Sequence, residues 1–351
     1  MAKNRPRIPS RKKDHVELTL TRDVSFRTRS AGFDEWDFVH NALPECDVAE
    51  IDTRVRFLNK ELSFPLIVSS MTGGYPDALK INRQLAELCA EHGLAMGVGS
   101  QRQALEDQTY HQTFSVARKA APEIPLFGNL GGAEVAKLRD AGPVLRLVDM
   151  IRADGFAVHL NPLQEYLQPE GNPQFKGVLE GIAMLVRQLP VPVMVKEIGA
   201  GISSAVARRL IDVGVRIIDV AGAGGTSWAG VEILRRARTA ARQKDPGEVF
   251  WDWGIPTADA LREVAALRRE VNDLVVVASG GLEDGLTLAK AVAMGAHAAG
   301  AARPILKALY AGGPKRLAAL IDGWKHQFVG AMFLTGSRSV KELQAQILRR
   351  R

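Results

Sequence analysis

Eight short apolar runs recur along the chain, and segments with a helical pattern separate them. Most of the runs are almost continuous in apolar residues, which is typical of parallel strands that are buried on both faces. They cover residues 65–70, 95–100, 124–130, 155–161, 192–197, 216–222, 274–281 and 296–303. Eight alternations of strand and helix predict an α/β fold, the (β/α)8 or TIM barrel. An open doubly wound sheet is the alternative, but it normally needs fewer strands.

The barrel accounts for most of the chain, and no low-complexity linker divides the sequence into two domains. We expect residues 1–64 to form a basic N-terminal arm that caps one barrel mouth. Residues 65–351 are then the barrel, and the whole chain is one domain. Two stretches exceed a minimal barrel: residues 159–191 after the fourth strand, and an inserted segment, residues 226–273, between strands six and seven. The inserted segment is a candidate interface between subunits.

The net charge of +7 comes from the two ends of the chain. Residues 1–15 carry six basic side chains and the sequence ends in three arginines; without these nine and Asp14, 37 basic side chains face 38 acidic ones. The nearly neutral body argues against a nucleic-acid-binding face. A basic arm can grip RNA or fold over a phosphorylated small molecule. A disordered, solvated tail is the simpler expectation for residues 1–9 and for the terminal arginines.

The sequence also bears on the compartment. No apolar stretch approaches the ~20 residues that a membrane helix needs. The basic N-terminus has no apolar run behind it, unlike a secretory signal. The cysteine content is low, since Cys46 and Cys89 are the two that occur, which fits a reducing compartment. We therefore expect a cytoplasmic protein without membrane contact.

The predicted strands end in polar or glycine-rich segments, such as SSMTGG (69–74), GNLGG (128–132) and AGAGGTSW (221–228). Barrel enzymes place their active sites at the carboxyl ends of the strands. Because so many such endings would meet on one face, we expect a ligand that the backbone approaches closely. The last two endings, SGGLEDG (279–285) and GAARP (300–304), are at the position where barrels often bind phosphate groups.

Two strand ends carry side chains suited to chemistry. Lys196 is near the end of a buried strand, where an amine is costly unless it meets an anion or takes part in a reaction. An ion pair with Glu197 is awkward, because neighbouring strand residues point to opposite faces. His159 and Asn161 share one face by the same alternation, and Gln164 and Glu165 follow directly. We expect this group to lie at the barrel mouth.

Taken together, the motifs resemble those of the type 2 isopentenyl-diphosphate isomerases. The resemblance runs from about residue 11 to 303, in the same order, and rests on RKKDH, SSMTGG, GVGSQRQ, GNLGG, HLNPLQE, VKEIGAGIS, AGAGGTSW, WGIPTADAL and SGGLEDG. HLNPLQE combined with the N-terminal RKxxH pattern is the most specific part. The resemblance implies an FMN-dependent barrel enzyme that interconverts isopentenyl and dimethylallyl diphosphates.

The resemblance further implies roles for individual residues. FMN would contact Met71, Thr72, Gly73, Ser100, Asn129, Lys196, Thr226, Gly281, Ala302 and Arg303. The diphosphate substrate would contact Arg11, Lys12, Ser100, Gln101, Arg102 and Gln164. His159, Asn161 and Gln164 would orient the substrate, and Glu165 would bind Mg²⁺, whose preferred ligands are hard oxygens. Reduced FMN would serve as acid and base, NADPH would prime it, and the enzyme would be a homo-oligomer, a tetramer or octamer.

Two positions depart from the family pattern. Ala221 stands where a serine often contacts the flavin, and Glu283 stands where SGG is usually followed by a hydrophobic residue and then Arg. An acidic side chain near a flavin phosphate is unfavourable, so we expect Glu283 to point outward. Both departures bear on FMN affinity and leave the reaction unchanged.

Three other functions compete with this interpretation. A flavin-dependent 2-hydroxy-acid oxidase needs a histidine base, usually after strand six, where AGAGGTSW has none. A nucleotide dehydrogenase needs a catalytic loop cysteine, but Cys46 precedes the barrel and Cys89 is within a predicted helix. A non-catalytic barrel that binds RNA or a protein through its arm leaves the polar strand endings unexplained.

Overall fold

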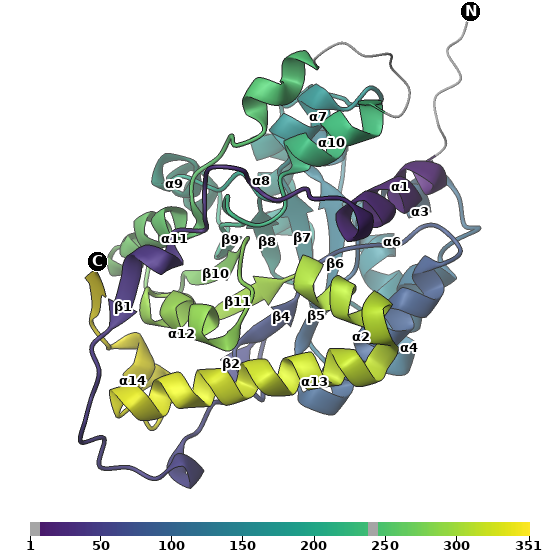
Figure 1. Ribbon diagram of the computed structural model, residues 1–351. Coiled ribbons are helices and arrows are strands. Elements are labelled where there is room, and N and C mark those ends of the chain that lie inside the picture. The colour runs from purple at the N-terminus through teal and green to yellow at the C-terminus, as the bar shows by residue number, and fades with distance from the viewer. Residues whose placement is uncertain (1–7, 238–244) are drawn as a thin grey trace, which may run out of the picture.

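Eight parallel strands close into a barrel in the computed structural model, which describes residues 8–237 and 245–351 (Figure 1). The barrel strands are β4 (Leu66–Val68), β5 (Ala95–Gly97), β6 (Leu126–Gly131), β7 (Gly155–His159), β8 (Val193–Lys196), β9 (Ile217–Asp219), β10 (Val275–Ser279) and β11 (Ala298–Ala301). Each lies within a predicted run, except that β6 extends one residue beyond its run, to Gly131. β11 pairs with β4 and thereby closes the sheet, so the TIM barrel is confirmed and the open sheet is excluded.

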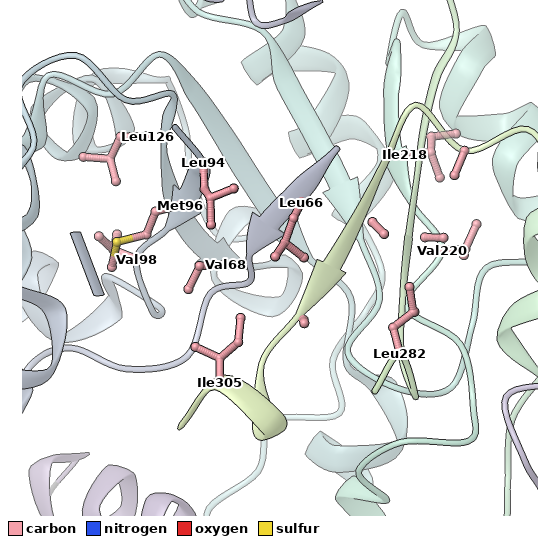
Figure 2. Packing of buried hydrophobic residues seen from close by; sticks show 14 of the residues in the cluster. Leu66, Val68, Leu94, Met96, Val98, Leu126, Ile218, Val220, Leu282 and Ile305 are labelled. Atoms are coloured by element: carbon pink, nitrogen blue, oxygen red, sulfur yellow. The ribbon is translucent and has the colours of Figure 1, made fainter. Parts of the chain in front are cut away.

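Alternation along each strand divides the apolar side chains into two cores. Ile67, Phe127 and Met194 belong to the core inside the barrel. Their neighbours, such as Leu66 and Val68, belong to the larger core between the strands and the surrounding helices (Figure 2). Because both faces of every strand are buried, the strand sequences need apolar residues at consecutive positions.

Helices cover the outside of the barrel (Figure 1). They are α2 (Ala78–His92), α3 (Arg102–Glu106), α4 (Gln112–Ala120), α5 (Gly132–Val135), α6 (Gly142–Ile151), α7 (Pro162–Leu167), α8 (Val178–Gln188), α9 (Ser204–Asp212), α10 (Trp228–Ala237), α11 (Thr257–Ala266), α12 (Gly285–Ala293), α13 (Arg303–Thr335) and α14 (Val340–Gln344). Helix α13 is kinked at Gly312 and Gly313, just before Pro314. Within the described residues, none of these helices has the length and apolar content needed to cross a membrane.

The segment before the barrel reaches both of its ends, which differs from the expected cap over one mouth. Helix α1 (Ile8–Thr21) packs against α10 beside the carboxyl ends of the strands. The hairpin of β2 (Val55–Phe57) and β3 (Lys60–Leu62) instead inserts Phe57 and Leu62 into the core inside the barrel. One end of the barrel is therefore filled by apolar side chains, and a site can form only at the other.

The last residues of the chain are ordered against the N-terminal segment. Strand β12 (Leu348–Arg350) pairs with β1 (Trp36–Phe38) in an antiparallel ribbon. Arg350 forms an ion pair with Glu35 and Arg351 with Asp37, at 2.5 and 2.7 Å. The C-terminal arginines are exposed, as expected, but the expectation of a disordered tail is wrong. Lys3, Arg5 and Arg7 of the basic arm lie outside the described residues.

The two extra stretches are largely helical. The segment after β7 begins with α7, where Pro162 occupies the first turn, and continues to α8. The inserted segment after β9 contains α10, a 3-10 turn (Pro246–Phe250) and α11. Its residues 238–244 lie outside the described part of the chain.

Candidate active site

A cavity of about 200 Å³ opens at the carboxyl ends of the strands. Its walls come from the segments after β4, β8, β9, β10 and β11 and from helix α1. The predicted site residues that line it are Lys12, Met71, Lys196, Thr226, Gly281, Ala302 and Arg303. This is the face on which TIM-barrel enzymes hold their active sites. The segments after β5, β6 and β7 do not line this cavity in the part of the chain that the structure describes.

The loops after β10 and β11 have the form of an anion cradle. Gly280 and Gly281 have φ angles of 102° and 74°, a region that favours glycine. A Cβ on Gly281 would also come within 2.8 Å of the Gly224 carbonyl. Among the described residues, the backbone N–H groups of Gly281 and Ala302 meet no hydrogen-bond acceptor. One free donor at the start of helix α13 and a second in the loop after β10 are suited to a phosphate group.

Arg303 lines the same cavity, but its guanidinium is bonded to the arm. It donates to the carbonyl of Thr19 at 3.3 Å, the hydroxyl of Ser25 at 2.8 Å and the carbonyl of Arg22 at 3.4 Å. Ser25 in turn forms a β-bridge with Thr226, another predicted phosphate contact. The end of helix α1 is thus fastened to two loops of the anion cradle.

Lys196 lies at the floor of the cavity and is 7% exposed. Its Nζ donates to the backbone carbonyl of Glu197 at 2.5 Å rather than to the Glu197 carboxylate. That carboxylate accepts the N–H groups of the next three residues, Ile198 to Ala200, at 2.5–2.7 Å. Among the described residues, the Lys196 and Glu197 side chains form no ion pair with each other, and Lys196 lines the cavity.

Lys12 closes the cavity on the β4 side. Its Nζ donates to the carbonyls of Gly73 and Ser100, at 2.5 and 2.7 Å. Burial, together with the charges of Arg11 and Arg102, lowers the pKa of Lys12 to about 7. With Lys12 in this position, Gly73 and Ser100 are covered and do not line the cavity. The buried Thr72 and Asn129 are also outside its wall.

Arg11 and Arg102, two other predicted diphosphate contacts, differ in their partners. Burial lowers the pKa of Arg11, and the neighbouring Arg102 adds to the effect; the Arg11 Nε is buried without a partner. Arg102 forms ion pairs with Glu106 and Glu134. These two arginines and Lys12 form a cationic cluster, in which Arg102 is paired with carboxylates.

Gln101 does not face the cavity, contrary to the expected substrate contact by its side chain. It is 0% exposed, its amide donates to the Leu147 carbonyl at 3.2 Å, and its Oε1 accepts the Asn129 N–H at 2.9 Å. Both ends of the side chain are therefore used to hold the loop after β5 against its neighbours.

His159 lies at the end of β7 and forms a hydrogen bond with Asn129, at 2.7 Å between Nδ1 and Oδ1. Burial lowers the pKa of His159 to about 3, and the charges of Lys196, Lys12 and Arg11 contribute to the shift. The imidazole is therefore neutral at neutral pH. It can orient a ligand, but it is not a proton reservoir.

The HLNPLQE segment and helix α1 are connected by hydrogen bonds to one acidic residue, Glu232. Asn161 donates to Gln164 and Glu165, at 3.0 and 3.1 Å. Gln164 donates to Glu232 at 3.1 Å, and the Nε2 of His15 lies 2.8 Å from the same carboxylate oxygen. The predicted group of polar residues is thus brought together with helix α1.

Glu165 faces Asn161 with one carboxylate oxygen and accepts from Gln168 and the Asn172 N–H with the other. In the described part of the chain, no group of three or more His, Cys, Asp or Glu residues is arranged to hold a metal ion. A metal bound by Glu165 would therefore need ligands from the substrate or from water.

Sequence reasoning missed several residues of this region. His15 and Glu232 connect the arm to the substrate-side network, and Trp228 separates the large cavity from a small hollow beside Gln164. Asp219 lies beside Lys196, in register with it on the neighbouring strand. A signal existed for Glu232 and Asp219, since each is an acidic residue among apolar neighbours that become buried.

The two departures from the family pattern both border the cavity. Ala221 has a φ of 38°, an uncommon angle for a residue with a side chain. Glu283 is exposed, as expected, but it lies on the cavity rim, and its charge opposes the lowering of the Arg303 pKa that burial causes.

A closed parallel barrel with polar loops around a cavity at the carboxyl ends of its strands is the architecture of a TIM-barrel enzyme. The model of the FMN-dependent dehydrogenase family matches residues 4–119 and 161–350. Solved structures agree on the fold. A mandelate oxidase superposes with a TM-score of 0.62 at 18% identity, covering 97% of this chain and 92% of that one. A Pediococcus acidilactici lactate oxidase superposes with a TM-score of 0.64 at 15% identity, covering 96% of this chain and 86% of that one.

Curated relatives are much more similar. Three of them, each named isopentenyl-diphosphate delta-isomerase, come from Chlorobium luteolum, Pelodictyon phaeoclathratiforme and Nostoc sp.. They are 48%, 44% and 44% identical, and the alignments cover 95%, 97% and 95% of this chain and 94%, 97% and 94% of the relatives. The chain belongs to the type 2 isopentenyl-diphosphate delta-isomerase family.

Proposed function

We propose that this enzyme interconverts isopentenyl and dimethylallyl diphosphates, with FMN in the large cavity, Mg²⁺ at the substrate and NADPH as the priming reductant. The observation that carries the proposal is the cavity itself, which has an anion cradle at one end, a buried lysine at its floor and a cationic cluster beside it. FMN and a diphosphate are two anionic ligands, and the site has two separate groups of donors for them. We further propose a cytoplasmic homo-oligomer, a tetramer or octamer.

The cavity fits FMN in its donors. Gly281, Ala302, Thr226 and Arg303 would hold the phosphate, and Met71 and Lys196 would border the ring. Thr72, Gly73, Ser100 and Asn129 would approach the cofactor once Lys12 leaves the carbonyls that it now covers. When reduced and bound, the flavin supplies a group that gives and takes a proton at carbon, a task that ordinary side chains perform poorly at neutral pH.

The substrate's diphosphate would be held by the cluster of Arg11, Lys12 and Arg102. Charge-assisted hydrogen bonds to phosphate oxygens are among the stronger polar contacts in proteins. A diphosphate next to Lys12 would favour the charged amine, whose pKa is lowered to about 7 in the structure described here. Glu165 would supply one oxygen ligand to a Mg²⁺ ion shared with the diphosphate.

His159, Asn161 and Gln164 would orient the alkene end of the substrate. The neutral His159 is fixed by Asn129, and Gln164 is fixed by Glu232. Their hydrogen bonds would restrict the substrate's position, which lowers the entropic part of the barrier. Trp228 and helix α1 would limit the access of water.

A 2-hydroxy-acid oxidase remains the nearest other activity, because such oxidases share the fold. The segment after β9 carries no histidine, and His159, on β7, has a pKa of about 3. A group with so low a pKa is a weak base for removing a proton from a hydroxy acid. The residues of this cavity therefore favour isomerisation.

The proposal is tested first by the visible spectrum of the purified protein with added FMN, and then by an anaerobic assay. The holoenzyme, reduced with NADPH or dithionite, is given isopentenyl diphosphate and Mg²⁺, and the dimethylallyl product is measured. We expect a bound-flavin spectrum, product formation, and no flavin reduction by lactate or mandelate. A protein that cannot take up FMN, or that is reduced by a 2-hydroxy acid, contradicts the proposal.

A further inference from the structure

Asp219 is a buried acidic residue that the proposed mechanism does not use. It is 3% exposed and ends strand β9, in register with Lys196 at the end of β8. Neighbouring residues in register on parallel strands point to the same face, so both side chains project into the barrel. Burial raises the pKa of Asp219, while the charge of Lys196 and the hydrogen bond from Ser279 oppose the rise.

The contacts of Asp219 connect it to the cavity floor. Its Oδ1 accepts the Ser279 hydroxyl at 2.8 Å and the Ala221 N–H at 3.2 Å. Asp219 and Lys196 line a small hollow of about 10 Å³ together with Ser69 and Ser70. Lys196 and these two serines also line the large cavity, so the hollow lies directly below it. The carboxylate is thus one layer beneath the place proposed for the flavin ring.

The barrel does not need a carboxylate at this position. An asparagine has the same shape and an oxygen that can accept both hydrogen bonds. A buried carboxylate costs several kcal/mol of solvation that its hydrogen bonds and a nearby cation must offset. Lys196 is the charged side chain that faces it, since the Glu197 carboxylate is turned toward its own loop. The property that distinguishes Asp219 from asparagine is its negative charge beside Lys196.

We propose that Asp219 is a positioning residue that acts through Lys196, partly offsetting the lysine's positive charge and so weakening the preference of the site for an anionic cofactor ring. This inference rests on the proposed binding of FMN. A flavin ring gains negative charge on reduction, so the ratio of reduced to oxidised FMN affinity reports the charge at the cavity floor. Asp219 keeps that ratio low. It thereby favours the neutral, protonated form of the reduced flavin ring, which holds the proton on which the isomerisation depends.

The test is the Asp219→Asn variant, which removes the charge and retains the shape. The midpoint potential of bound FMN is measured for wild type and variant at neutral pH, with the dissociation constants of oxidised and reduced FMN as a second readout. We expect the affinity for reduced FMN to rise at least about tenfold relative to the affinity for oxidised FMN. This corresponds to a rise of the midpoint potential by about 30 mV for a two-electron couple. Ser279→Ala, which removes one donor to the carboxylate, should shift the potential in the same direction by less.

Asp273→Asn is the matched control. It removes the same charge from an exposed side chain that pairs with Arg216, on the segment before β10 and away from the cavity, and it should leave the potential unchanged. An unchanged or lower potential in Asp219→Asn overturns the inference. If that variant does not fold, an unchanged or lower potential in Ser279→Ala overturns it instead. A wild-type protein that binds no FMN would remove the proposed function and this inference together, whereas normal FMN binding with an unshifted potential removes the inference alone.

Discussion

Glu232 joins parts of the chain that are far apart in sequence. It is 0% exposed, and its carboxylate contacts His15 of the arm, Gln164 of the segment after β7 and Arg235 of its own helix. Burial alone would raise its pKa, but the hydrogen bonds and charges of His15 and Arg235 outweigh burial and hold it at about 2. The charged form is therefore strongly favoured in the folded protein.

This low pKa predicts how stability changes with pH. Because the folded pKa is below the ordinary value of 4.5, Glu232 stabilises the fold above about pH 4.5 and loses that contribution as the pH falls toward 2. The pKa shift of Glu232 corresponds to a contribution of roughly 3 kcal/mol to the free energy of unfolding near neutral pH. Glu232→Gln should lower the free energy of unfolding near pH 7 and flatten its decline in acid, measured by urea denaturation at several pH values. Glu87→Gln, on the exposed face of α2, should follow wild type; parallel curves for both variants would count against the account.

Gly73 is required by close packing. A Cβ at this position would lie 2.1 Å from the ring of Phe114, which is fully buried. We expect Gly73→Ala to lower the free energy of unfolding by about 1–3 kcal/mol, the usual cost of overpacking, and to weaken FMN binding. Gly323→Ala is the control, because Gly323 lies in α13 with no atom within 4 Å of the added Cβ, and it should be neutral or stabilising. Equal unfolding free energies for the two variants would show that the Phe114 contact is unimportant.

At the scale of elements, helix α1 was not predicted although its residues were singled out. RKKDH lies in a helix with few apolar residues, and the packing of Leu18 with Val24 and Val231 supports it. Such a helix depends on contacts across more than two hundred residues, which local patterns do not contain. Once the segment is helical, Arg11 and His15 lie one turn apart, so both side chains are on the same face of the helix.

The fastening of α1 by Arg303 predicts a link between the cofactor loops and the arm. Arg303→Lys loses the planar fork that reaches Thr19, Arg22 and Ser25. We expect faster amide hydrogen exchange in residues 11–25 and about tenfold weaker substrate binding. Arg316→Lys, an exposed position on the same helix, should change neither. Unaltered exchange in the Arg303 variant would show that other contacts hold the arm.

At the scale of the whole molecule, the barrel was predictable because each strand must be apolar on both faces. The number of strands then determines closure. The pairing of β1 with β12 was not predictable, because it joins distant parts of the chain. The insertion of Phe57 and Leu62 into the core inside the barrel was not predictable either, because they fill a space that exists only after closure. For the site, the argument from buried charge identified Lys196, but it was not applied to Asp219 or Glu232.

The central claim is isomerisation without net oxidation or reduction, by a chain that shares its fold with mandelate and lactate oxidases. The most direct measurement is the amount of dimethylallyl diphosphate formed per bound FMN after a single anaerobic reduction, with no further reductant. We predict many molecules of product per flavin, with the flavin still reduced at the end. Product limited to one molecule per reducing equivalent, or none at all from a holoenzyme that binds FMN, would contradict this account.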